Sequence, residues 1–240
     1  MIVYPEYWCK NYNDYDIDTD PELFANTFID FLKINIEEIK VSHLAYSGGV
    51  DSTILLCLLT DYFGVDKVHT YTISLRDDHP DILFARQGAE FYRSIHHEFI
   101  VEPEDESIYE NKGDNAVKQF YDKAKNYTDK MICGDGIDEF MCGYYLHCDE
   151  SEETYRYFIS RLLPDHLVPL HKNSGEVKVF LPYLESYILE FIQSIDLKHK
   201  VDSNSRKKIV MLAAKLLGIP SKFIDRNKYG FVDAFREIDK

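Results

Sequence analysis

One short segment of the chain has the residue types and spacing of a phosphate-binding loop. The segment is Ser47-Gly48-Gly49-Val50-Asp51-Ser52, with a half-apolar stretch before it and a continuous apolar run, 53–59, after it. This pattern predicts a strand, a turn through two glycines and a buried helix. Such a turn brings backbone N–H groups, hydroxyl donors and the positive end of a helix to one point. A phosphate or a pyrophosphate fits that arrangement.

Asp51 narrows what this loop is able to bind. A Gly-Gly pair between a strand and a helix is often only a tight turn. A carboxylate in a phosphate-binding turn repels the ligand unless a cation lies between them, so the acid favours a magnesium–nucleotide site. The loop lacks the Gly-Lys-Ser/Thr ending of a Walker A motif. It resembles the PP-loop of N-type ATP pyrophosphatases, enzymes that cleave ATP between the α- and β-phosphates.

A second cluster of acids follows another apolar stretch, 130–133. It is Gly134-Asp135-Gly136-Ile137-Asp138-Glu139, in which three acids lie among glycines. Acid-rich glycine turns are often only solvated, but a magnesium pyrophosphate site needs a second carboxylate besides Asp51. The segment resembles the GEGADE-type signature of asparagine synthetases, with Asp135 at the place of its glutamate.

The elements that must position these segments alternate along the chain. Strands are predicted at 41–46, 67–74, 97–101 and 130–133, and helices at 23–34, 53–59, 82–92, 115–127, 153–163, 183–195 and 205–217. The alternation predicts an α/β fold with a doubly wound, mostly parallel sheet. Ligands of such sheets bind at the carboxyl ends of strands, so we expect both segments to face one crevice.

The resemblance to asparagine synthetases extends from about residue 25 to residue 232. Further similar stretches are 68–74, Pro80-Asp81, Ala85-Arg86, His96-His97-Glu98, 179–185, which is similar to an R-x-P-F-L-D motif, and 226–231, which resembles a closing basic segment. The chain thus resembles the synthetase domain of the asparagine synthetase family, whose relatives include the β-lactam synthetases. The resemblance implies PP-loop (adenine nucleotide alpha hydrolase-like) topology with a C-terminal helical portion.

The same resemblance implies a two-step reaction with ATP and Mg²⁺. A carboxylate attacks the α-phosphate of ATP and releases pyrophosphate, and an amine then displaces AMP to form an amide. The implied magnesium ligands are Asp51 and Asp138, and Lys228 stabilises charge on the phosphates. The implied catalytic residues are Lys228, Asp135, Asp51 and Asp138. The implied ATP-binding residues are Ser47, Gly48, Gly49, Asp51, Ser52, Thr53, Ala45, Tyr46, Ile73, Ser74 and Gly134.

The substrates are less well defined than the reaction. Glutamine-using relatives begin with a cysteine directly after the initiator Met and a glutaminase domain, whereas residue 2 is Ile here. We therefore expect free ammonia, a separate glutaminase subunit or an amine on the substrate to supply nitrogen. Aspartate is the leading carboxylate. The alternatives are a β-lactam-synthetase-like or other specialised ligase on another carboxylate, and a non-catalytic nucleotide-binding domain.

Composition disfavours several other classes of protein. The formal net charge is −15 and the pI is near 5.0, which disfavours a nucleic-acid partner and so a tRNA-thiolating enzyme. The sequence shows no membrane span and no signal pattern. The five cysteines are irregularly spaced, which predicts reduced thiols in a cytoplasmic protein and no structural metal. His96 and His97 are adjacent strand positions, so their rings point to opposite faces and cannot chelate one metal. The sequence leaves the oligomeric state open.

The predicted domain organisation is simple. Residues 1–20 form an irregular, tyrosine-rich N-terminal arm, and Asp20-Pro21-Glu22 has the pattern of a helix N-cap followed by proline. Residues 21–240 form a single domain, with a sheet core at about 21–145 and a helical substrate-side portion at about 146–240. We find no linker or repeat that divides it.

Overall fold

The computed structural model describes residues 20–102 and 112–225. These residues fall into two compact units, which we describe separately. The sheet unit comprises residues 40–102, 112–133, 169–180 and 220–225, and the helical unit comprises residues 20–39, 134–168 and 181–219. The predicted arm lies outside the described residues except for Asp20, and the domain organisation stays a prediction.

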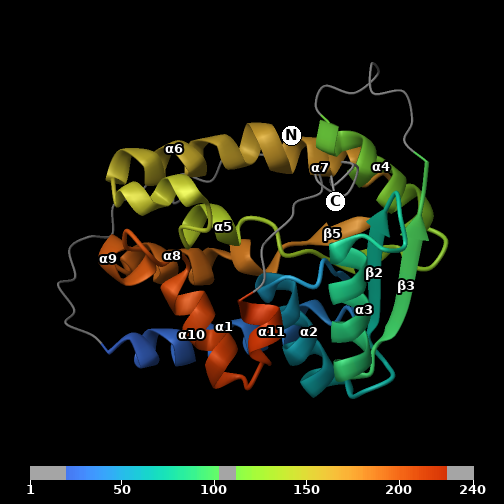
Figure 1. The fold of residues 1–240 in the computed structure, drawn as a ribbon, viewed down its shortest axis with the longest axis horizontal. Coiled ribbons are helices and arrows are strands. Elements are labelled where there is room, and N and C mark those ends of the chain that lie inside the picture. The colour runs from blue at the N-terminus through green and yellow to red at the C-terminus, as the bar shows by residue number, and fades with distance from the viewer. Residues whose placement is uncertain (1–19, 103–111, 226–240) are drawn as a thin grey trace. The chain divides into compact units, whose positions relative to one another are not determined.

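The sheet unit is built on a parallel sheet, as Figure 1 shows. In the described residues the sheet has five strands in the order β3-β2-β1-β4-β5, and every neighbouring pair is parallel. The strands are β1 (His43–Ala45), β2 (His69–Ser74), β3 (Ile95–Ile100), β4 (Lys130–Ile132) and β5 (Lys178–Phe180). The helices of this unit are α2 (Val50–Phe63), α3 (Pro80–Tyr92), α4 (Lys112–Ala124), α7 (Val168–Asn173, from its second residue) and α11 (Ser221–Ile224).

Helices cover both faces of the sheet. Glu98 and Phe99 are consecutive residues of β3, so their side chains point to opposite faces. Glu98 pairs with Arg86 of α3, whereas the Phe99 ring packs on Phe120 of α4 with ring centroids 5.9 Å apart. The predicted α/β class with a doubly wound parallel sheet is therefore confirmed.

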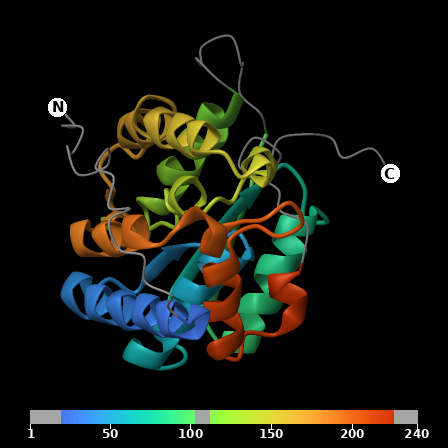
Figure 2. The same ribbon diagram turned by 90° about the vertical axis from the view of Figure 1, so that its left-hand side faces the viewer.

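The helical unit begins with α1 (Pro21–Ile39), which packs against α8 and α10 (Figure 2). The Glu22 N–H donates to Asp20 Oδ1 at 2.9 Å, which confirms the predicted N-cap. Phe24, Phe28 and Leu32 recur at every fourth position and are buried, as a helix face requires. The other elements are α5 (Ile137–Phe140), η3 (Tyr145–Asp149), α6 (Glu152–Leu162), η4 (Leu163–Leu167), η5 (Pro182–Leu184), α8 (Ser186–Ser194), α9 (Leu197–Lys200) and α10 (Lys208–Leu216).

Several short helices, such as α7 and α9, were not predicted, and three further elements differ from the sequence-based expectation. The short strand β5 was not predicted, because its three residues gain strand structure only by pairing with β4. The helix predicted at 183–195 is broken, since Glu185 is extended between η5 and α8. The helix predicted at 205–217 begins only at Lys208, because Lys207 has the left-handed backbone conformation, with φ of 53°.

The predictions of reduced cysteines and of no membrane span can be compared with the structure only for the described residues. The four cysteines in the described residues form no disulfide. No helix in residues 20–102 and 112–225 combines the length and apolar character of a membrane span.

A stack of aromatic rings fills the α4 side of the sheet. The rings of His43 and His69 stack at 4.7 Å, and those of Tyr71 and His97 at 4.6 Å. His69 Nδ1 lies 3.1 Å from His97 Nε2, and His43 Nδ1 lies 2.8 Å from the Tyr71 hydroxyl. Burial, and then the neighbouring His69 and His97, lower the pKa of His43 to about 4, although Asp129 acts in the opposite direction. Burial also lowers the pKa of His69 and of His97.

The stack makes the folded state sensitive to acid. Since the pKa of His43 is about 4 in the folded state and 6.5 without burial, the unfolded chain binds more protons between these values, and stability falls as the pH drops from 6.5 toward 4. Urea denaturation at pH 7.5, 6.0 and 5.0 measures this slope. We expect His43→Asn to reduce the slope, because it removes an ionisable ring from the stack. His171→Asn, at an exposed position outside the stack, is the control for losing a histidine. Equal slopes in the unmodified protein and His43→Asn would contradict the assignment.

Candidate functional site

The predicted phosphate loop connects β1 to α2 in the sheet unit. Gly48 has φ of 69°, which favours glycine, whereas Gly49 is extended with φ of −81° and precedes the first residue of α2. The N-cap residue is Gly49, which has no side chain to cap the first turn. The first N–H groups and the positive end of α2 therefore meet at the loop, as in anion-binding helices.

The hydroxyl groups of the loop are close together and bonded within it. Ser47 Oγ lies 3.2 Å from Ser52 Oγ and accepts from the Gly49 N–H at 3.3 Å. The hydroxyls of Ser52 and Thr53 donate to the Gly49 carbonyl at 3.1 and 2.8 Å. An incoming phosphate would take over these donors by rotation about χ1.

Gly48 is fixed by contact with α3 as well as by its backbone conformation. A Cβ atom on Gly48 would lie 2.6 Å from the Ala85 backbone nitrogen and 2.8 Å from the Phe84 carbonyl carbon. Backbone atoms of a helix cannot shift aside cheaply. The loop is therefore held against the middle of α3, at Phe84 and Ala85. Glycine at position 48 is thus required by packing as well as by its backbone conformation.

We expect Gly48→Ala to destabilise the protein strongly. It combines a positive φ, which costs about 1 kcal/mol, with an overlap that adds about 1–3 kcal/mol. Gly218→Ala is the matched control, because Gly218 has nearly the same positive φ, 71°, but has no atom within 4 Å of the added Cβ. Urea denaturation should show Gly48→Ala to be the less stable variant. Equal losses of stability would show that the contact with α3 is unimportant.

The predicted adenine- and ribose-side residues lie at the carboxyl ends of β1 and β2. These strands are adjacent and parallel, and Ala45, Tyr46, Ile73 and Ser74 are all buried. The Tyr46 N–H donates to the Tyr71 carbonyl at 2.8 Å, its hydroxyl lies 3.2 Å from Thr53 Oγ1, and its carbonyl accepts from the Thr72 hydroxyl. Tyr46 thus connects the loop helix to β2.

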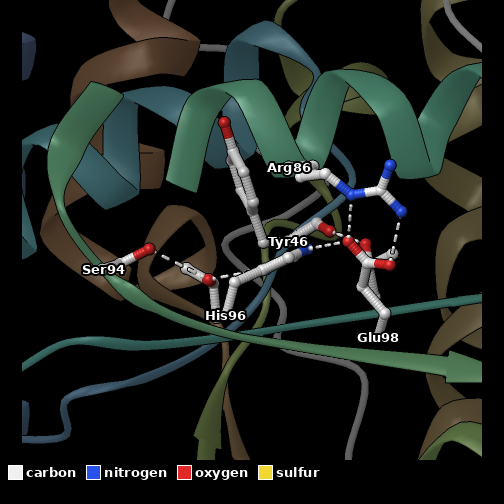
Figure 3. A network of polar contacts seen from close by, with 7 residues as sticks. Tyr46, Arg86, Ser94, His96 and Glu98 are labelled. Carbon is white, nitrogen blue, oxygen red and sulfur yellow. Dashed lines mark hydrogen bonds and ion pairs between the residues drawn. The ribbon is translucent and has the colours of Figure 1, made fainter. Parts of the chain in front are cut away.

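Figure 3 shows the polar network beneath α3. Arg86 donates twice to Glu98, at 2.8 Å each, and His96 Nε2 lies 3.5 Å from Glu98 Oε1. His96 Nδ1 lies 2.9 Å from Thr70 Oγ1, and Ser94 Oγ lies 3.0 Å from the same atom. Burial lowers the pKa of His96 to about 4, and the hydrogen bond from Arg86 lowers the pKa of Glu98. His96 and His97 are consecutive residues of β3 with different partners, Thr70 and His69, so their rings lie on opposite faces of the sheet, as predicted.

The second acidic segment begins directly after β4. β1 and β4 are adjacent parallel strands, so Tyr46 and Cys133 follow strands that end at the same sheet edge. Gly134 and Asp135, both half-buried, are the first residues of this segment and belong to the helical unit. There Gly136, with φ of 93°, leads into the four residues of α5, and Asp138 lies in its first turn.

Asp138 forms a buried ion pair that the sequence did not reveal. Lys207 Nζ lies 2.5 Å from Asp138 Oδ1, and the two side chains are 7% and 13% exposed. A Cβ on Gly143 would lie 1.7 Å from that oxygen and 2.4 Å from Lys207 Cε, so the pair needs glycine at this position. Arg206 donates to the Gly143 carbonyl and stacks on the Tyr145 ring at 3.6 Å.

Glu139, like Lys207, was not selected as a site residue from the sequence. It is 2% exposed, its Oε1 accepts from the Tyr144 hydroxyl at 2.6 Å, and His166 Nδ1 lies 3.8 Å from the same oxygen. Burial raises the pKa of Glu139, against the hydrogen bond from Tyr144. Consecutive acids of one short helix therefore have different environments, since Asp138 faces a lysine and Glu139 a phenol.

The donor chemistry of both acids fits magnesium. Asp51 is 8% exposed in the first turn of α2 and offers carboxylate oxygens, and Asp138 offers the same donors beside Lys207. No group of three His, Cys, Asp or Glu ligands was found in residues 20–102 and 112–225. Magnesium commonly binds through one or two carboxylates and takes its other ligands from phosphates and water, so the chemistry of each acid suits this ion.

Lys228 lies outside the described residues. The chain before it is anchored in the sheet unit, because α11 packs on α2, and Phe223 packs on Phe91 of α3 with centroids 6.3 Å apart. Lys222 Nζ also donates to Gln87 Oε1 at 3.3 Å. The last described turn before Lys228 thus lies against the helix that follows the phosphate loop.

Comparisons with known proteins agree with the resemblance. The family model described as asparagine synthase matches residues 44–169. A glutamine-hydrolysing asparagine synthetase from Methanocaldococcus jannaschii is 24% identical over 133 residues, which cover 50% of this chain and 25% of that protein. One from Dictyostelium discoideum is 24% identical over 199 residues, or 68% of this chain and 36% of that protein. The chain spans about a quarter to a third of these relatives.

Two solved structures are also similar to the chain. An NMN synthetase from Francisella tularensis has a TM-score of 0.48 at 16% identity, covering 91% of this chain and 79% of that one. An NH3-dependent NAD synthetase from Campylobacter jejuni has a TM-score of 0.36 at 15% identity, covering 75% of this chain and 95% of that one.

Proposed function

We propose, because the chain belongs to the asparagine synthase family, that it is an ATP-dependent ligase that forms amides through an acyl-adenylate. A carboxylate oxygen attacks the α-phosphate of ATP and pyrophosphate leaves. An amine nitrogen then attacks the acyl carbon, loses a proton, and AMP leaves with the former carboxylate oxygen. Aspartate is the leading carboxylate, and ammonia or another amine is the nitrogen source.

The observation that carries this proposal is the N-terminus of α2. It combines a left-handed Gly48, a glycine N-cap that has no side chain of its own and a buried Asp51 in the first turn. Phosphate alone would be repelled by that acid, whereas a magnesium-bound pyrophosphate would be held by both the N–H groups and the carboxylate.

The predicted site residues have different roles in the adenylation step. Ser47, Gly48, Gly49, Ser52 and Thr53 hold the pyrophosphate half of ATP, and Ala45, Tyr46, Ile73, Ser74 and Gly134 line the adenosine half. Asp51 and Asp138 bind magnesium, which when bound neutralises charge on the phosphates. Lys228 adds a positive charge as pyrophosphate departs, and Asp135 orients the substrate or accepts a proton. Catalysis is mainly alignment and charge neutralisation.

The aspartate at position 135 favours a second candidate function, which is also that of an AMP-forming ligase. Asp135 is one methylene shorter than the glutamate of the family signature. A shorter acid alters the room for the carboxylate substrate. A specialised ligase, similar to the β-lactam synthetases, would adenylate a different acid and use an amine of its own substrate.

Exchange of labelled pyrophosphate into ATP tests the proposal. The protein is assayed with magnesium and a panel of carboxylates that begins with aspartate and glutamate, each with and without ammonium. Exchange with one acid, followed by amide and AMP when ammonium is present, identifies the substrate. Exchange without any effect of ammonium favours the second candidate. Measurable binding of MgATP with no exchange for any acid would contradict the ligase and favour a non-catalytic nucleotide-binding domain.

A further inference from the structure

The last residue of α9 is a buried lysine that the proposed reaction does not use. Lys200 is 2% exposed, its Nζ donates to the Tyr155 hydroxyl at 3.0 Å, and it lies 4.6 Å from the centre of the Tyr155 ring. Burial lowers the pKa of Lys200 to about 8, while Cys142, Glu152 and Asp196 act in the opposite direction. The ammonium therefore interacts with Tyr155 both as a hydrogen-bond donor and as a cation over its ring.

Tyr155 connects Lys200 to the acidic segment that contains Asp138. Its hydroxyl donates to the Phe140 carbonyl at 3.2 Å. Phe140 is the last residue of α5 and lies two residues after Asp138. A cation that bonds to the phenol oxygen makes the phenol a stronger donor to the carbonyl. Lys200, Tyr155 and Phe140 thus form a chain of contacts that links α9, α6 and α5, all within the helical unit.

The acidic segment depends on such support. α5 has only four residues and lies between two left-handed positions, Gly136 with φ of 93° and Cys142 with φ of 59°. A single helical turn is not stable by itself, because nucleating a helix fixes more backbone freedom than one hydrogen bond repays. The direction of the Asp138 side chain is therefore set by the contacts that hold the ends of α5.

Burying an ammonium is expensive, and a methionine would fill similar space without that penalty. We propose that Lys200 is a positioning residue, which acts through Tyr155 on α5 and so fixes Asp138 for adenylation. This inference rests on the proposed function. It explains why the chain keeps a charge where an apolar side chain would serve stability as well.

The test compares Lys200→Met and Tyr155→Phe with Lys198→Met, a control on the same helix whose side chain is 63% exposed. Three quantities are measured on the full chain: the thermal midpoint, hydrogen–deuterium exchange over residues 134–143, and pyrophosphate–ATP exchange kinetics. We expect Lys200→Met to keep or raise the midpoint, to speed amide exchange at Met141 and Gly143, and to lower kcat roughly tenfold with an unchanged KM for the carboxylate. Tyr155→Phe should also speed amide exchange and lower kcat, but it should lower the midpoint, because it removes the hydroxyl that accepts from the buried Lys200 ammonium. The double variant should have a kcat no lower than either single variant.

The outcomes separate this inference from the proposed function. Amide exchange in Lys200→Met equal to that in Lys198→Met would overturn the inference, as would faster amide exchange with an unchanged kcat. A lower midpoint with proportionate loss of all activity would also overturn it, because that is a structural role only. If the unmodified protein exchanges no pyrophosphate with any acid, the proposed function fails, and unequal amide exchange in the variants still supports the contact chain.

Discussion

Asp51→Asn should abolish carboxylate-dependent pyrophosphate release. The substitution keeps the size of a side chain that is 8% exposed but removes the charge that a magnesium ion would bind. Losing one preorganised electrostatic group in a dry site commonly costs 10²–10³-fold, and losing the metal as well should cost about 10³-fold or more. Stability should fall only slightly, by about 0.3–1 kcal/mol, since an acid in the first turn interacts favourably with the helix dipole.

Asp61→Asn is the matched control for this variant. Asp61 lies on the same helix, α2, but is exposed and near its carboxyl end. Its removal should leave pyrophosphate release unchanged. Initial rates of pyrophosphate release at saturating MgATP make the comparison. Release by Asp51→Asn within about threefold of the unmodified rate would remove Asp51 from the metal site.

The second large effect is expected at the buried pair of Asp138 and Lys207. Asp138→Asn should lose pyrophosphate release and also destabilise the fold by about 3–5 kcal/mol, because it removes one charge of a buried ion pair. Adding Lys207→Met removes the other charge of that pair. The double variant should therefore regain stability without regaining activity.

Urea denaturation and pyrophosphate release on the same samples separate the two roles of Asp138. An Asp138→Asn variant as stable as the unmodified protein would contradict the buried pair. A double variant that is stable and active would show that Asp138 is needed only to neutralise Lys207. A stable, inactive double variant is the result that a magnesium-binding role predicts.

Sequence reasoning located the turn between β1 and α2 because its signal is local. Gly48, Gly49 and the apolar run after them specify a turn and a helix through backbone sterics and hydrophobicity alone. The N-cap at Asp20 and the parallel sheet follow from similarly local patterns. The contact of Gly48 with Ala85 strengthens the same turn, but it connects residues far apart in the sequence and was not foreseen.

The features that sequence reasoning missed depend on contacts between distant parts of the chain. Lys207 appears in the sequence as one of three consecutive basic residues, Arg206-Lys207-Lys208, and nothing local distinguishes it. Only its left-handed backbone and the turn after α5 direct it to Asp138. Glu139 was likewise not distinguished from its neighbours, because its burial is set by Tyr144 and the residues around it. A three-residue strand such as β5 carries too few residues for a periodic signal.

Transfer of ¹⁸O from the carboxylate to AMP tests the central claim most directly. The protein is incubated with MgATP, ammonium and the accepted carboxylate labelled in both oxygens, and the products are analysed by mass spectrometry. Attack on the α-phosphate predicts AMP that carries one ¹⁸O atom, together with unlabelled pyrophosphate. Label in inorganic phosphate with formation of ADP, or AMP that carries no label, would contradict an acyl-adenylate and with it the function proposed for this chain.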